Sequence, residues 1–138
     1  MVGDTAARLG RLGIFADLTE AELRDVAAEL GEQSFPEGGW VLRQGETGTG
    51  LFIIVDGEVG VVIDDDERAT LTTGSFFGEV SVLLGEPVTA DIVVRKQLRC
   101  LVIPPRRAEE FLIAYPRVMY RMLQIEARRL RTVDPERD

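Results

Sequence analysis

The apolar residues change their spacing near Ser34, and this change constrains the fold more than any other feature of the sequence. After Ser34 they fall in short β-branched runs, and Gly and Pro separate the runs. A period of two with frequent turn residues is typical of short antiparallel strands. We therefore expect four or five strands between residues 34 and 78, arranged as an antiparallel sandwich or barrel.

The turn residues set the expected strand boundaries. Asp56 and Gly57 lie inside FIIVDGEVGVVI, between two apolar runs, and predict a tight hairpin. The acidic run Asp64–Glu67 is expected to be a solvated hairpin loop. After a helical interruption near residues 77–84, residues 89–103 are expected to add two more strands.

Helical patterns flank the strands on both sides. Thr19 and Glu22 form a capping box at the start of one helix, and Pro104 with Pro105 is expected to end the sheet. Apolar residues at spacings of three and four predict two helices before the strands and two after them, over residues 5–15, 19–31, 105–116 and 117–133.

The charged and metal-binding residues exclude several classes of function. The net charge of −8 argues against a nucleic-acid partner, because such surfaces mass Lys and Arg against phosphates. With no His and one Cys, the chain lacks the residues for transition-metal sites and for His-containing catalytic triads. No apolar run approaches the roughly 18 residues of a membrane span, and no signal-peptide pattern is found. A cytoplasmic protein without a membrane partner is expected.

The length of 138 residues predicts one domain, over residues 1–133, followed by a disordered tail at residues 134–138. Cys100 lies inside an apolar run and is expected to pack as a small buried residue.

Three stretches occur in this order along the chain: LGIFADLTEAEL, GETGTGLFIIVDGEVGVV and FFGEVSVL. They resemble the entry helices, the glycine-marked third and fourth strands and the phosphate-binding cassette of the cyclic nucleotide-binding domain. This family occurs in catabolite-activator-type regulators, cyclic-nucleotide-dependent kinases and gated channels. The resemblance implies an α+β fold, mainly β: a double-stranded, jelly-roll-like β-roll flanked by N-terminal helices and two C-terminal helices.

The resemblance also implies a ligand site in the cassette. Gly78 lets the backbone approach a ligand, and the short helix after it directs unpaired N–H groups at a phosphate. Glu79 can accept a hydrogen bond from a ribose hydroxyl or, alternatively, cap the short helix. The expected ligand-binding residues are Phe77, Gly78, Glu79, Val80, Ser81, Val88, Thr89 and Ala90.

One cassette position departs from the family pattern. Nucleotide-binding members carry an Arg directly before a small hydroxyl residue and Ala, and this Arg clamps the cyclic phosphate. The chain reads GEPVTAD, so Thr89 and Ala90 match the pattern while Val88 occupies the Arg position. Weak or absent cAMP and cGMP binding is therefore expected. Arg95 or Arg99 is an alternative source of the missing cation.

These observations favour a non-catalytic regulatory domain, because no nucleophile–base pair is available and the resembled fold is a binding fold. No cofactor is expected. A cyclic nucleotide or another, less anionic small molecule is the expected ligand. The alternative is a functional cAMP or cGMP sensor that tolerates Val88.

The last helix carries apolar residues over a wide arc, in two neighbouring rows. One row can cover the β-roll, and the other is then left for a partner. A homodimer through this helix is expected, and the alternative is a monomer in which the helix covers the pocket as a lid. The rows are Val118, Met122, Ile125 and Arg129, and then Met119, Leu123, Glu126 and Leu130.

Overall fold

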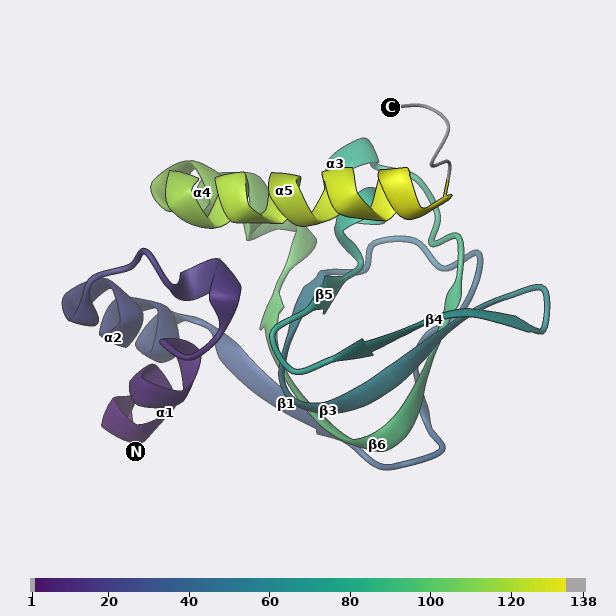
Figure 1. Cartoon of the computed structure of the whole chain (residues 1–138), viewed down its shortest axis with the longest axis horizontal. Helices are drawn as coiled ribbons and strands as arrows, with labels where there is room; N and C mark the ends of the chain where they lie inside the picture. The colour runs from purple at the N-terminus through teal and green to yellow at the C-terminus, as the bar shows by residue number, and fades with distance from the viewer. Residues whose placement is uncertain (1, 134–138) are drawn as a thin grey trace.

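A curved antiparallel sheet forms the centre of the molecule, with helices beside it and across one end (Figure 1). The computed structural model describes residues 2–133, with side chains for residues 5–131. Neighbouring strands follow the order β1-β6-β3-β4, while β2 pairs with β6 and β5 pairs with β3. This arrangement confirms the expected α+β, mainly β roll. The strands are β1 (Gly31–Phe35), β2 (Trp40–Leu42), β3 (Leu51–Ile63), β4 (Asp66–Thr72), β5 (Phe76–Phe77) and β6 (Asp91–Ile103).

Helices precede and follow the strands, as expected. The predicted capping box is confirmed, because the Thr19 side chain accepts from the Glu22 amide at 3.1 Å and the Glu22 carboxylate accepts from the Thr19 amide at 2.9 Å. The tail expected at residues 134–138 lies outside the described residues. The helices are α1 (Val2–Leu9), the 3-10 helix η1 (Gly13–Phe15), α2 (Glu20–Glu29), α3 (Glu79–Leu84), α4 (Pro105–Ala114) and α5 (Pro116–Val133).

The prediction of a tight hairpin at Asp56 and Gly57 is wrong. Strand β3 runs through both residues, with register shifts against β6 on either side of them. Gly57 has φ of 112°, and a Cβ atom there would lie 2.3 Å from the Gln97 carbonyl oxygen, so glycine is required for this bulge. The tight turn lies at Asp64 and Asp65 instead, both with positive φ, as a type I′ hairpin requires.

The stretch 89–103 contains one long strand, β6 (Asp91–Ile103), rather than the two expected. Strand β6 pairs with β1, β2 and β3 along its length. The polar residues Arg95–Gln97, which interrupt the apolar pattern, are exposed opposite the β3 bulge and leave the strand continuous.

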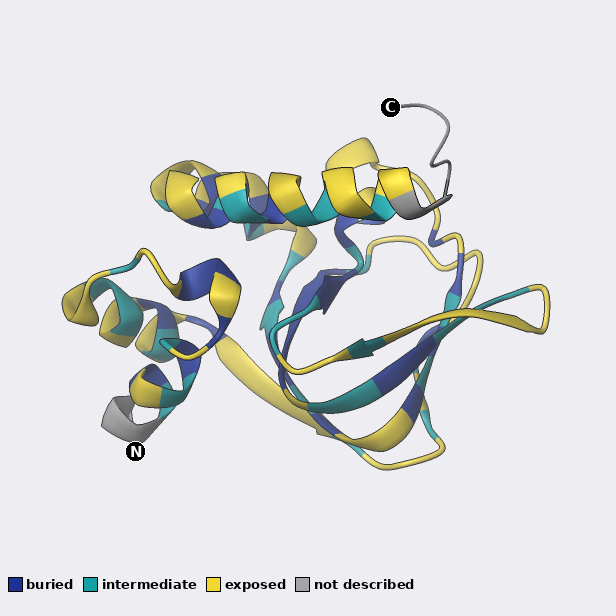
Figure 2. Cartoon of the chain, in the orientation of Figure 1, coloured by how far each residue is buried: buried dark blue, intermediate teal, exposed yellow. Residues whose placement is uncertain are grey.

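Two clusters of buried apolar residues hold the fold together. Figure 2 shows the buried residues in dark blue. One lies between the helices and the sheet and includes Phe15, Leu101 and Val118. The other fills the inside of the roll and includes Phe77 and Cys100. Burying a side chain of Val, Leu or Phe size contributes about 1.5–3 kcal/mol, so these clusters are the main source of stability. Burial also raises the pKa of the Cys100 thiol to about 12, which leaves it protonated and unreactive.

Helix α5 lies across one end of the roll (Figure 1). Its row of Val118 and Met122 is buried against the first cluster, so one of the two predicted rows does face inward. Arg121 donates two hydrogen bonds to the Asp17 carboxylate, at 2.6 and 2.9 Å, and ties the helix to the N-terminal segment. No helix within residues 2–133 combines the length and apolarity that a bilayer crossing demands.

Candidate functional site

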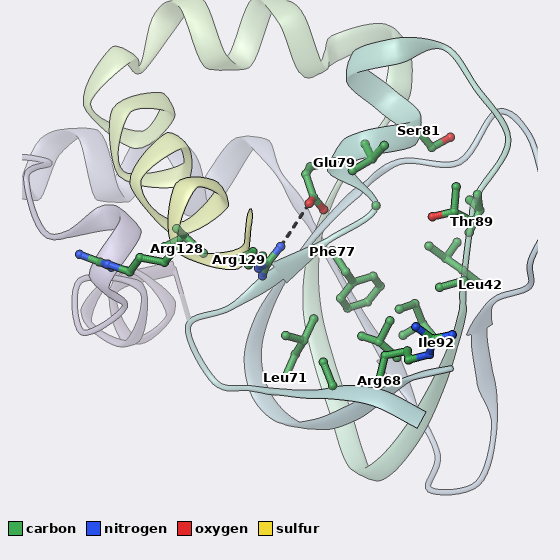
Figure 3. Close-up of a pocket in the computed structure, with 17 residues that line it drawn as sticks. Leu42, Arg68, Leu71, Phe77, Glu79, Ser81, Thr89, Ile92, Arg128 and Arg129 are labelled. Atoms are coloured by element: carbon green, nitrogen blue, oxygen red, sulfur yellow. Dashed lines mark hydrogen bonds and ion pairs between the residues drawn. The ribbon is translucent and has the colours of Figure 1, made fainter. Parts of the chain in front are cut away.

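A cavity of about 490 Å³ opens between α3, the end of α5 and the inner face of the roll. Its volume is within the range of small-molecule sites. All eight residues expected from the cassette line it, together with residues of β2, β3, β4, β6 and α5. The structure thus brings the expected set to one place, and their role as ligand contacts stays a prediction. Figure 3 shows this lining.

Gly78 makes the sharp turn from β5 into α3. Its φ is 85°, and a Cβ atom there would lie 2.4 Å from the Gly50 carbonyl oxygen. Any side chain would push the turn away from β3, so glycine is needed for the packing alone. Within α3, the Ser81 hydroxyl donates to the Glu86 carbonyl oxygen at 2.5 Å and fixes the loop that follows. Gly78 and Ser81 therefore have structural roles that are independent of a ligand.

Val88 belongs to the apolar cluster inside the roll and is only 8% exposed. Its amide donates to the Glu46 carbonyl oxygen and its carbonyl oxygen accepts from the Gly45 amide, each at 2.8 Å. The neighbouring Asp91 carboxylate accepts from the Gln44 amide at 2.7 Å. The segment that carries Val88 is thereby fixed, and it presents a methyl surface to the cavity where the family pattern has a cation.

Glu79 is buried, and its carboxylate pairs with Arg129 of α5 (Figure 3). Nη1 of Arg129 lies 3.1 Å from Glu79 Oε2 and 2.9 Å from Glu126 Oε1, so two carboxylates share one guanidinium nitrogen. Nη2 donates to Ser75 Oγ and to the Phe76 carbonyl oxygen at 2.9 Å each. The guanidinium also lies over the Phe76 ring, 4.4 Å from its centroid.

This arrangement perturbs the titration of Glu79. Burial, followed by the hydrogen bond and charge of Glu126, raises the pKa of Glu79 from 4.5 to about 7, and the Arg129 charge opposes the shift. The N-cap residue of α3 is Gly78, which has no side chain to cap the helix. The Glu79 carboxyl group contacts its own backbone amide as well as Arg129, so the helix-cap role stays open beside the ligand role.

Arg129 is a site residue that sequence reasoning missed. It was expected only as the end of one of the two rows on the last helix, with the inward row left open. The available signal in the sequence was that Arg129 lies four positions after Ile125, a residue that also lines the cavity. That signal places Arg129 on the inward face of α5 and gives no indication of a pairing with Glu79.

The two arginines considered as replacements for the missing cation lie elsewhere. Arg95 pairs with Glu67 at 2.6 Å, and Arg99 lies 3.4 Å from Glu32. Among the described residues, neither belongs to the cavity lining.

Arg68 and Arg128 do line the cavity. Arg68 is largely exposed and pairs with Asp66 at 3.0 Å. The Arg128 side chain extends away from the cavity centre in Figure 3.

Within the described part of the chain, no group of three or more His, Cys, Asp or Glu side chains is arranged to hold a metal ion.

The chain matches the family model described as "Cyclic nucleotide-binding domain" over residues 32–115. It is 32% identical over 116 residues to a cGMP-dependent protein kinase of Plasmodium berghei, a match that covers 84% of this chain and 14% of the kinase. A second such kinase, of Eimeria tenella, is 31% identical and is covered over 12% of its length. The chain therefore spans a small part of these relatives.

Solved structures share the fold. The catabolite activator protein of Thermus thermophilus is 26% identical with a TM-score of 0.77, over 89% of this chain and 60% of that chain. The regulatory subunit of a cAMP-independent protein kinase A from Trypanosoma brucei has a TM-score of 0.79 over 91% of this chain and 46% of that one. Its identity of 22% makes this a likeness of fold alone.

Proposed function

The chain belongs to the cyclic nucleotide-binding domain family, and from this premise we propose that it is a non-catalytic regulatory domain with weak or absent affinity for cAMP and cGMP. The cavity between α3, α5 and the roll is its ligand site. The observation that carries the proposal is the apolar Val88 side chain in the cavity wall, at the position of the phosphate-binding Arg.

The expected loss of affinity is large. Removal of one partner from a buried, hydrogen-bonded charge pair costs about 2–5 kcal/mol, which is roughly thirtyfold to several-thousandfold in affinity. The Arg129 guanidinium does not replace the missing cation in this proposal, because it already binds Glu79, Glu126, Ser75 and the Phe76 carbonyl oxygen. An anionic ligand would have to break those contacts first.

The second candidate is a functional cAMP or cGMP sensor, and the position of Arg68 favours it. Arg68 lines the cavity from β4, and its partner Asp66 is itself largely exposed. An exposed ion pair is worth about 0–1 kcal/mol, so a phosphate can compete with Asp66 for this guanidinium.

Calorimetric titration with cAMP and with cGMP separates the two candidates. The regulatory domain without the clamp is expected to bind neither, or to bind near the millimolar range, which is about a thousandfold weaker than a micromolar site. If the unmodified chain binds cAMP or cGMP with micromolar affinity and Arg68→Ala loses this binding, the chain is a cyclic-nucleotide sensor instead. The homodimer through α5 and the cytoplasmic location stay predictions from the sequence.

A further inference from the structure

The walls of the cavity suit a flat apolar body. The Phe77 ring points into the cavity (Figure 3) and stacks on Phe52, with ring centroids 5.0 Å apart and an interplanar angle of 5°. Aliphatic side chains from four strands and two helices supply most of the remaining surface, and they include Leu42, Val61, Leu71, Val80, Ile92 and Ile125. Such walls bind a ring system by dispersion and by removing its surface from water.

Among the described residues that line the cavity, the buried side offers a negative charge no cation that is not already paired. Arg129 is committed to Glu79 and three other acceptors, and Arg128 extends away from the centre (Figure 3). Arg68 is 55% exposed and pairs with Asp66, so a contact from it to a phosphate would be screened by solvent and would contribute little. A phosphate bound against Val88 would therefore lose its hydration without gaining a buried cation, which is unfavourable for a charged group.

The polar groups that remain suit hydroxyl groups on a ligand. A carboxyl group has about four lone-pair sites; for Glu79, Arg129 and its own backbone amide use two of them, and Glu126 is a further hydrogen-bond partner. Thr89 carries a hydroxyl on the facing side of the cavity (Figure 3), and a hydroxyl can both donate and accept. A ligand hydroxyl can donate to the Glu79 carboxyl oxygen that remains, whether the group is ionised or protonated.

The geometry points to an uncharged, hydroxyl-bearing ring compound of the nucleoside class as the ligand of this cavity. The inference rests on the proposed function, because it takes the cavity as the regulatory site. It goes further by naming the chemistry that the cavity accepts: a ring against Phe77, hydroxyl groups toward Glu79 and Thr89, and no phosphate at Val88.

The test compares uncharged and charged forms of the same ligand on the unmodified chain. Calorimetric titrations use adenosine, guanosine, cAMP and cGMP at physiological salt. The Debye length is then about 8 Å, so the repulsion between the net negative charge of the chain and a charged ligand is largely screened. At least one nucleoside is expected to bind about tenfold or more tightly than its cyclic monophosphate, a difference of about 1.4 kcal/mol.

Two variants at neighbouring positions locate the binding. Ala69 lies on β4, is exposed and lines the cavity, so Ala69→Phe fills part of it. Thr70 is also exposed but is not among the described lining residues, and Thr70→Phe is the matched control. Nucleoside binding is expected to be lost in the first variant and kept in the second, with both folded by circular dichroism. Nucleoside binding that survives in a folded Ala69→Phe would place the site elsewhere and overturn the inference.

The titration on the unmodified chain decides the matter even if Ala69→Phe does not fold. A cyclic monophosphate that binds as tightly as its nucleoside would overturn the inference, and micromolar binding of that monophosphate would overturn the proposed function as well. If no nucleoside and no cyclic monophosphate binds, the inference is wrong while the loss of cyclic-nucleotide binding stands.

Discussion

Arg129 Nη1 lies 3.1 Å from Glu79 Oε2, although the two residues are 50 positions apart in the chain. Through Glu79, Ser75 and Phe76, this one guanidinium joins α5 to the start of α3 and to β5. The placement of α5 and the charge state of the buried cavity carboxylate are therefore linked. A change in either is expected to alter the other.

Arg129→Ala is expected to destabilise the fold, because Glu79 and Glu126 would face each other without a cation. Hydrogen bonds to charged groups contribute about 1.5–3 kcal/mol, and Arg129 is partly exposed, so we expect a loss of about 2 kcal/mol. For a chain of this size that lowers the melting temperature by about 5–10 °C. The control is Arg106→Ala, at an exposed position of α4. Equal melting temperatures for the two variants would contradict a structural role of Arg129.

Glu79 makes stability depend on pH. Burial and Glu126 raise its folded-state pKa from 4.5 to about 7. Because the folded value lies above the unfolded one, the contribution of Glu79 is fully present below pH 4.5 and is lost as the pH rises through about 7. Glu79→Gln removes this titration at nearly the same side-chain shape.

Thermal melts of both proteins at several pH values check this sign. The melting temperature of the unmodified chain, minus that of Glu79→Gln, is expected to fall between about pH 5 and about pH 8. A difference that stays constant over this range, or that rises, would contradict the raised pKa of Glu79.

Val88→Arg is expected to strengthen cAMP or cGMP binding by about tenfold or more, because it restores a charge-assisted contact at the cassette. Its melting temperature is expected to fall, since Val88 leaves the apolar cluster of the roll. Val80→Arg is the matched control: it adds the same charge at an exposed lining position on α3. Tight binding by the unmodified chain, or no gain in a folded Val88→Arg, would show that the missing cation is not what limits affinity.

The sequence predicted the features that depend on neighbouring residues. The capping box of Thr19 and Glu22 is local, and so is the cassette, whose eight expected residues lie within fourteen positions of the chain and meet in one cavity. The error at Gly57 has a non-local cause. Its glycine resembles a turn residue, but it is required by the approach of the Gln97 carbonyl oxygen from β6.

The pairing of Arg129 with Glu79 is non-local for the same reason. Helical spacing indicates which face of α5 carries Arg129, but the partner depends on how α5 lies across the roll, which is a tertiary relationship. The expected loss of the phosphate-binding cation depends on one local position, Val88. The structure adds that the guanidinium closest to Glu79 belongs to another element and is already paired.

The outer row of α5 predicts self-association. Leu123 and Leu130 are each about 60% exposed, while Glu126, which interrupts this row in the sequence, turns to pair with Arg129. At 18 residues, or about 27 Å, the helix is long enough for a two-helix seam. Met119, the first residue of this row, packs against the first apolar cluster, so the exposed apolar part is Leu123 and Leu130, two turns apart. From two exposed leucines we expect a modest, concentration-dependent dimer.

Light scattering over a range of concentrations tests this dimer. Leu123→Glu is expected to keep the monomer mass at concentrations where the unmodified chain approaches twice that mass, with little change in melting temperature because the side chain is exposed. The control is Ile113→Glu, which places the same charge on an exposed apolar position of α4 and is expected to leave the dimer intact. A monomer mass for the unmodified chain throughout, together with a lower melting temperature for Leu123→Glu, would show that α5 serves only the fold and the cavity of its own chain.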